Sequence, residues 1–129
     1  MRYLAIAPLA IALAATMLPH PGLAATPCTD LTPKSAGRFE AEAPIPPFTP
    51  LCYAFTIQTG QQAAIRVTTA DRMAFGLETV QPGGATKLLV DRRQTYLLTA
   101  EAPTYHVLVA SEDLHPDTTH RFTLVIEVK

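Results

Sequence analysis

The sequence predicts an all-β protein: a jelly-roll-like antiparallel β-sandwich of about eight short strands, preceded by a cleaved signal peptide. Three observations predict this fold class. Apolar residues recur at every second position in several segments, turn residues separate these segments, and no helical period longer than two turns follows the N-terminal segment. Because successive side chains of a strand point to opposite faces, this rhythm marks strands with one buried face. Many short strands divided by turns are typical of a sandwich or barrel.

The first 25 residues are typical of a secretory signal peptide. Arg2 supplies a positive charge, residues 4–18 are almost wholly apolar, and residues 20–25 break a helix and end in small side chains. This order predicts cleavage after Ala24 or Ala25 and a periplasmic or secreted protein. The alternative is a membrane anchor, but an apolar run of about 15 residues is shorter than the roughly 20 that a spanning helix needs. We expect no membrane span after cleavage.

The remaining chain is long enough for one domain and too short for two. We divide the sequence into the signal peptide at 1–25, a proline-rich N-terminal segment at 26–50 and the sandwich core at 51–129. The 10 Lys and Arg residues and the 11 Asp and Glu residues are spread without runs. Nucleic acid and anionic membranes require a clustered basic face, so neither is an expected partner. No cofactor motif is visible, and no cofactor is expected.

Two cysteines, Cys28 and Cys52, follow the signal peptide. In an exported protein an even number of cysteines indicates a disulfide, and two allow a single pairing. Closing a loop of this size restricts the unfolded chain by about 3 kcal/mol in the entropic model. The bond would pin the proline-rich segment to the first core strand. Metal binding by the pair is much less favoured, because the CxxC spacing and partner ligands are missing.

Prolines dominate residues 26–50 and exclude a helix or a central strand from most of that segment. Residues 36–42 contain no proline, and they predict an edge strand. An extended crossover of polyproline character is expected at 43–50.

Residues 51–67 carry two alternating apolar sets on either side of Gly60. Because Gly60 accepts the positive φ of a tight connection, a hairpin is the simplest interpretation. The two sets are Tyr53, Phe55 and Ile57, then Ala63, Ile65 and Val67.

Further strands are expected at 73–80, 105–109 and 122–128, where apolar residues again alternate. Gly76 interrupts the first of these and indicates a bulge or a close backbone approach. Residues 81–84, Gln-Pro-Gly-Gly, are the strongest turn signal in the chain.

Residues 87–90 and 94–98 are apolar at adjacent positions, so their inward faces stay ambiguous. Between them, Asp91, Arg92 and Arg93 predict a tight turn with two guanidinium groups. A planar guanidinium can hold a carboxylate of a partner through two hydrogen bonds. The alternative, which we favour, is a charged turn that keeps neighbouring strand edges soluble. With the polar turn after residue 67, the possible partner-binding residues are Asp71, Arg72, Arg92 and Arg93.

The richest polar cluster lies between the last two expected strands. Histidine and carboxylate ligands suit zinc, and carboxylates with backbone carbonyls suit calcium. We favour a solvated loop, because neither an EF-hand order nor an HExxH pattern is present. The metal-ligand candidates are Glu112, Asp113, His115, Asp117 and His120.

The order of these segments resembles bacterial pre-peptidase C-terminal domains, over about 75 residues from 51 to the C-terminus. The matching patterns are Y-x-F-x-hydrophobic at 53–57 followed by Gly60-Gln61, Y-x-hydrophobic-x-V at 105–109, and the closing strand at 121–126. The chain departs from the family where Pro103-Thr104 replaces the common glycine before the penultimate tyrosine. The resemblance implies a jelly-roll-like sandwich.

The chain also resembles the periplasmic inhibitors of goose-type lysozyme. The shared features are the same Y-x-F and G-Q pattern and a closing strand at 122–129 that ends in a lysine. This resemblance implies a protein that inserts a loop into the lysozyme cleft and pairs with its catalytic carboxylates.

Residues suited to catalysis are scarce. Neither Ser35 nor Ser111 lies in a G-x-S-x-G elbow. Ser111, Glu112 and His106 do not form a triad by spacing alone. The sequence therefore favours a non-catalytic exported binding or accessory module with a protein or cell-envelope partner. A lysozyme inhibitor is the second interpretation, and a metal-assisted hydrolase is a distant third.

Overall fold

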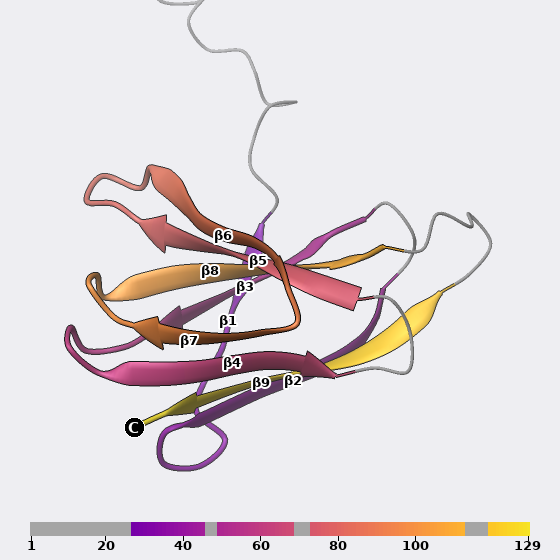
Figure 1. Cartoon of the computed structure of the whole chain (residues 1–129), viewed down its shortest axis with the longest axis horizontal. Coiled ribbons are helices and arrows are strands. Elements are labelled where there is room, and N and C mark those ends of the chain that lie inside the picture. The colour runs from indigo at the N-terminus through magenta and orange to yellow at the C-terminus, as the bar shows by residue number, and fades with distance from the viewer. Residues whose placement is uncertain (1–26, 46–48, 69–72, 113–118) are drawn as a thin grey trace, which may run out of the picture.

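The structure, a computed structural model, describes residues 27–45, 49–68, 73–112 and 119–129. The described residues form strands and no helix, arranged as two stacked sheets (Figure 1). Within those ranges, no helix is long and apolar enough to span a membrane. The predicted signal peptide, residues 1–25, lies outside the described residues.

The all-β sandwich is confirmed. All neighbouring strands are antiparallel except β1 and β3, which are parallel. The five-stranded sheet has the order β1 (Cys28–Asp30), β3 (Leu51–Thr56), β8 (Thr104–Ser111), β5 (Met73–Val80) and β6 (Thr86–Arg93). The four-stranded sheet has the order β2 (Arg38–Ile45), β9 (His120–Val128), β4 (Gln62–Thr68) and β7 (Thr95–Thr99).

The core lies between the sheets and consists of the alternate side chains that the sequence pattern indicates. Aromatic rings connect the two layers, because Phe39 of β2 lies 5.8 Å from Phe55 of β3, measured between ring centroids. Tyr53 of β3 lies 6.1 Å from Phe122 of β9. Within the five-stranded sheet, Phe55 stacks on Tyr105 at 5.9 Å. Such pairs add to the free energy gained from burying apolar area.

The predicted hairpin at residues 51–67 is wrong, because β3 and β4 belong to different sheets. The connection between them crosses from one layer to the other, and Gly60 in it has a φ of +94°. It lies beside the connection from β7 to β8, which crosses in the opposite direction. Gly60 N–H donates to the carbonyl oxygen of Ala100, and Ala100 N–H donates to that of Gln61. Alternation and a permissive glycine fit an arch between sheets as well as a hairpin within one.

The predicted edge strand is confirmed as β2, which lies at the edge of the four-stranded sheet. It extends to Ile45 and includes Pro44, so the expected crossover does not begin at residue 43. An edge strand pairs on one side alone, which is why a proline without an N–H group is tolerated there. Residues 46–48 lie outside the described part of the chain.

The turn predicted at residues 81–84 is confirmed and joins β5 to β6, with a hydrogen bond from Gly84 N–H to Gln81 O. The tight turn predicted at 91–93 is wrong, since these residues are the last three of β6. The chain changes sheets at Gln94 and descends to β7 (Figure 1). Gln94 holds this crossing in place: its Nε2 donates to the carbonyl oxygen of Met73, and its own carbonyl accepts from Val67 N–H.

Candidate binding groove beside Arg92

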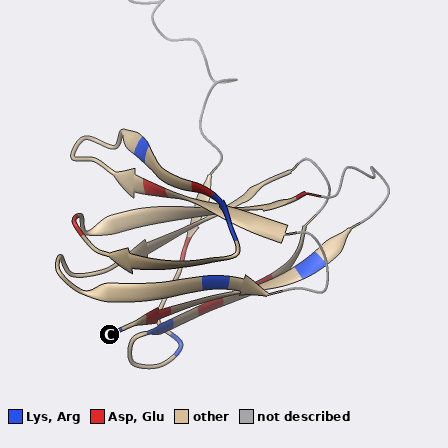
Figure 2. Cartoon of the chain, viewed as in Figure 1, with Lys and Arg blue, Asp and Glu red and all other residues tan. Residues whose placement is uncertain are grey.

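The two outer faces of the sandwich differ in chemistry. On the four-stranded sheet, Arg38 contacts Glu40 at 2.9 Å and Glu127 at 3.1 Å, and Arg66 contacts Glu127 at 3.0 Å. Glu40 and Arg66 flank Val125 in register, and this outward residue is only 4% exposed. Figure 2 shows the basic and acidic segments on β2, β9 and β4. Arg38, Glu40, Arg66 and Glu127 thus form a connected set of ion pairs on this face.

The outer face of the five-stranded sheet presents small and apolar residues instead. Because Phe75, Leu77 and Val109 point into the core, the residues between them on β5 and β8 point outward. A groove of about 530 Å³ crosses β8, β5 and β6 on this face. We call it the Arg92 groove. Its floor includes Ala74, Gly76, Leu108 and Ala110, and Glu78, Leu88, Asp91, Arg92, Ser111 and Glu112 also line it.

A β-bulge shapes the groove where β6 meets Gly76. Phe75 pairs with Arg93 and Leu77 with Val90, so Gly76 alone faces two residues of β6, Asp91 and Arg92. The bulge or close approach predicted at this glycine is confirmed. A Cβ atom on Gly76 would lie 3.5 Å from the carbonyl oxygen of Val90 and 3.7 Å from Asp91 Oδ1. Both distances are ordinary van der Waals contacts, so β6 lies directly beside Gly76 at the bulge.

Arg92 has a φ of +54° and is the one residue other than glycine with positive φ in the described part of the chain. For an L-residue this left-handed conformation costs about 1–2 kcal/mol. Bulges redirect side chains, and strained non-glycine residues concentrate at functional sites. Arg92 lines the groove, and its guanidinium forms no ion pair with another described residue.

Three carboxylates share the groove with that single guanidinium. They belong to Glu78, Asp91 and Glu112, and none of them forms an ion pair within the residues that the structure describes. The floor between these charges is apolar, and Leu88 beside it is 56% exposed. The groove is therefore suited to a partner segment that brings apolar side chains together with more positive than negative charge.

Arg93 lies on a different surface from its neighbour Arg92. It lines a hollow of about 410 Å³ on the four-stranded sheet, together with Arg66, Tyr96 and Leu97. The structure thus separates the two guanidinium groups that are adjacent in sequence. The other two possible partner-binding residues, Asp71 and Arg72, lie outside the described residues.

The side chains that the sequence left unassigned in the groove are Glu78, Leu88 and the small residues of its floor. One signal was available: alternation from the inward Phe75 and Leu77 places Ala74, Gly76 and Glu78 together on the outer face. No comparable signal existed for Leu88, because β6 is apolar at two adjacent positions.

Of the metal-ligand candidates, Asp113, His115 and Asp117 lie outside the described residues. Glu112 follows β8 and lines the Arg92 groove, whereas His120 begins β9 and is 8% exposed. Among the described residues, the group with the spacing of metal ligands is Cys28, Cys52 and His106. The predicted disulfide joins Cys28 to Cys52, with their Cα atoms 4.4 Å apart, so in this oxidised state the sulfur atoms are not thiolate ligands.

No family model and no curated protein matches the chain. Several solved structures do match the chain. The Aeromonas hydrophila PliG, described as a periplasmic lysozyme inhibitor of g-type lysozyme, has a TM-score of 0.61 at 12% identity and covers 81% of this chain and 100% of its own. The Salmonella Typhimurium PliG has a TM-score of 0.56 at 15% identity, with the same coverage.

A second kind of protein has the same architecture. The pre-peptidase C-terminal domain of a collagenase from Bacillus anthracis has a TM-score of 0.56 at 13% identity. The match covers 82% of this chain and 98% of that domain. At these identities the comparisons establish the fold. The chain therefore has the β-sandwich fold that the PliG inhibitors and the pre-peptidase C-terminal domain share.

Proposed function

We propose that this chain is an exported, non-catalytic module that binds a protein partner in the Arg92 groove. The observation that carries the proposal is the strained conformation of Arg92 in a bulged edge strand, where Arg92 lines a groove with an apolar floor and forms no ion pair with another described residue. The left-handed conformation of Arg92 costs about 1–2 kcal/mol, and such strain is typically retained at functional sites. The disulfide and the periplasmic PliG proteins support export.

The absence of catalysis is supported by the placement of the residues that the sequence offers for hydrolysis. Ser111 and His106 lie on the same strand, five positions apart. At about 3.4 Å per residue this separation is roughly 17 Å, far beyond hydrogen-bond reach. His106 therefore does not act as the base that would activate Ser111 as a nucleophile.

Retention of an envelope protein on the immobilised mature chain tests this function. Arg92→Ala removes the guanidinium, and Leu88→Lys places a charge beside the apolar floor. Arg121→Ala is the matched control, because Arg121 pairs with Glu42 on the opposite face, where both side chains are exposed. We expect one partner to be retained by the wild type and the control and lost from both groove variants. A partner that all four proteins retain equally, or the lack of any partner, contradicts the proposal.

The finer form of the proposal is that the partner is a g-type lysozyme, which the chain inhibits. The observation that favours it is the fold shared with PliG proteins from two organisms over 81% of the chain. Inhibition would place a loop in the lysozyme cleft, with a basic residue against the catalytic carboxylates. Arg72, between β4 and β5, is the sequence candidate for that residue.

A lysozyme panel tests the inhibitor function directly. Cell-wall lysis by g-type lysozyme is measured with the wild type, Arg72→Ala, Arg92→Ala and the Arg121→Ala control. Inhibition that Arg72→Ala weakens and Arg121→Ala retains supports loop insertion, whereas loss in Arg92→Ala alone assigns the contact to the groove. Full activity of every lysozyme type at micromolar concentrations of the chain rules out inhibition but leaves the binding module in place.

A further inference from the structure

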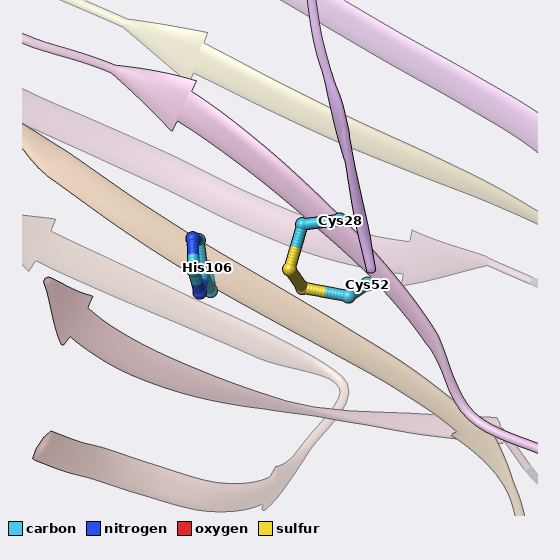
Figure 3. Close-up of side chains that lie close together, drawn as sticks. All are labelled: Cys28, Cys52 and His106. Atoms are coloured by element: carbon cyan, nitrogen blue, oxygen red, sulfur yellow. A yellow bond between two sulfur atoms is a disulfide. The ribbon is translucent and has the colours of Figure 1, made fainter. Parts of the chain in front are cut away.

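His106 lies beside the disulfide on the outer face of the five-stranded sheet. Figure 3 shows its ring on β8 next to the bridge between Cys28 of β1 and Cys52 of β3. Strand register places these three residues together. Cys28 pairs with Cys52, and His106 pairs with Ala54, which lies two positions further along β3. Cys28 and His106 are each partly exposed, so the cluster is accessible from solvent.

The spacing of these three groups is that of metal ligands. A ring nitrogen of His106 and both Sγ atoms lie within 4.8 Å of one another. Two thiolates on one tetrahedral zinc ion, each about 2.3 Å from it, are roughly 3.8 Å apart. Opening the bridge therefore requires the sulfur atoms to separate by less than 2 Å, roughly, to reach ligand positions. Rotation of the two side chains can supply this while β1 stays paired with β3.

We propose that the reduced form of the chain binds a thiophilic cation, with Zn²⁺ as the representative ion, through Cys28, Cys52 and His106. A dithiol reductant supplies two electrons and two protons, which convert the disulfide into two thiols while the dithiol closes to its own disulfide. Binding of Zn²⁺ then displaces the two thiol protons, and neutral His106 contributes a nitrogen lone pair. Three protein ligands leave the fourth tetrahedral position to water.

The consequence is a second way of holding β1 against the sandwich. In the oxidised chain the bridge ties β1 to β3. In the reduced, metal-bound chain the ion ties β1 to both β3 and β8, because His106 belongs to β8. Metal binding would therefore replace the crosslink that reduction removes.

Spectroscopy with Co²⁺ as the probe tests the proposal. The mature chain is reduced with a phosphine, which takes up oxygen from water and delivers two thiols, and is titrated with Co²⁺ and then with Zn²⁺. We expect a sulfur-to-cobalt charge-transfer band that saturates at about one equivalent, and its loss when Zn²⁺ displaces Co²⁺. The oxidised chain is the matched control and should give no such band.

One histidine variant and one control variant identify the third ligand. His106→Ala should weaken Co²⁺ binding by the reduced chain about tenfold or more, because one of three ligands is lost. Arg121→Ala, on the outer face of the four-stranded sheet, should leave the affinity unchanged. Absence of the charge-transfer band from the reduced wild type overturns the proposal, whether or not circular dichroism shows a folded chain. Equal binding by His106→Ala, or loss in Arg121→Ala, overturns it as well.

Discussion

The carbonyl oxygen of Val128 lies 2.7 Å from the position that a Cβ atom on Gly37 would occupy. Gly37 has a φ of +71°, and its own carbonyl oxygen accepts a hydrogen bond from Val128 N–H at 2.7 Å. The turn before β2 is thereby joined to the end of β9. Glycine is required here for two reasons: its φ is positive, and a Cβ atom would collide with the carbonyl oxygen of Val128.

Replacing Gly37 by alanine should destabilise the fold by about 2 kcal/mol or more, because the left-handed conformation alone costs 1–2 kcal/mol, roughly, and the collision adds to it. Gly83→Ala is the matched control, since Gly83 has a φ of +95° but no atom within 4 Å of its Cβ position. Chemical denaturation of the three proteins measures the difference. Equal losses in the two variants would show that the contact with Val128 contributes nothing.

Replacing Tyr105 by phenylalanine should lower the free energy of unfolding by about 1–3 kcal/mol. The Tyr105 hydroxyl accepts hydrogen bonds from the N–H groups of Glu101 at 2.8 Å and Ala102 at 3.2 Å, and the residue is 1% exposed. Without the oxygen, both donors lose their partner. Tyr96→Phe, at a partly buried site, is the control for loss of a hydroxyl, and urea unfolding compares the two. A loss no greater than that of the control would contradict the role of these bonds.

The ion pair between Arg38 and Glu40 predicts a specific pH dependence of stability. The hydrogen bond from Arg38 lowers the pKa of Glu40 below its ordinary value of 4.5. A carboxyl with a lowered pKa stabilises the folded state above that ordinary value and loses the contribution as the pH falls through the lowered pKa. Glu40→Gln should therefore be less stable than the wild type near neutral pH, and the difference should vanish in acid.

Urea unfolding of both proteins at a series of pH values measures this difference. Because the pair is partly solvent-exposed, we expect a small effect that added salt reduces. A difference that stays constant down to acid pH would show that Glu40 acts through packing rather than charge.

Replacing Arg92 by glycine should raise the free energy of unfolding by about 1 kcal/mol or less, because glycine adopts a φ of +54° without strain but orders a more flexible unfolded chain. Arg93→Gly, one position along the same strand, should instead lower it by about 0.5–1 kcal/mol. Thermal and chemical unfolding test the opposite signs. Destabilisation of equal size in both variants would mean that Arg92 carries no strain.

The inward side chains of the sandwich were predictable, because a strand with one buried face has apolar residues at every second position of its sequence. Phe55, Val107 and Leu124 all follow that pattern and are buried. The pairing of strands was not predictable, because Gly60 and the residues around it fit either an arch or a hairpin. What selects the arch is pairing of β3 with β8 and of β4 with β9, and those partners lie far away in sequence.

The candidate site was predictable in part. Arg92 was named from its chemistry as a possible partner-binding residue, a role that stays a prediction, and Gly76 was named as a bulge from its position within a strand. Their relationship depends on the bulge, in which one residue of β5 faces two of β6, and such a register shift leaves no local trace in the sequence. The meeting of His106 with the disulfide is likewise a product of register across three strands.

The two connections that cross between the layers are hydrogen-bonded to each other through Gly60 and Ala100. Both connections link the two layers, so we expect this end of the molecule to close late in folding. Contacts of such long range make the search for the native state slow, because chain entropy is lost before they form. We therefore expect folding on the timescale of milliseconds to seconds, and simultaneous release of both connections when the protein opens from this end.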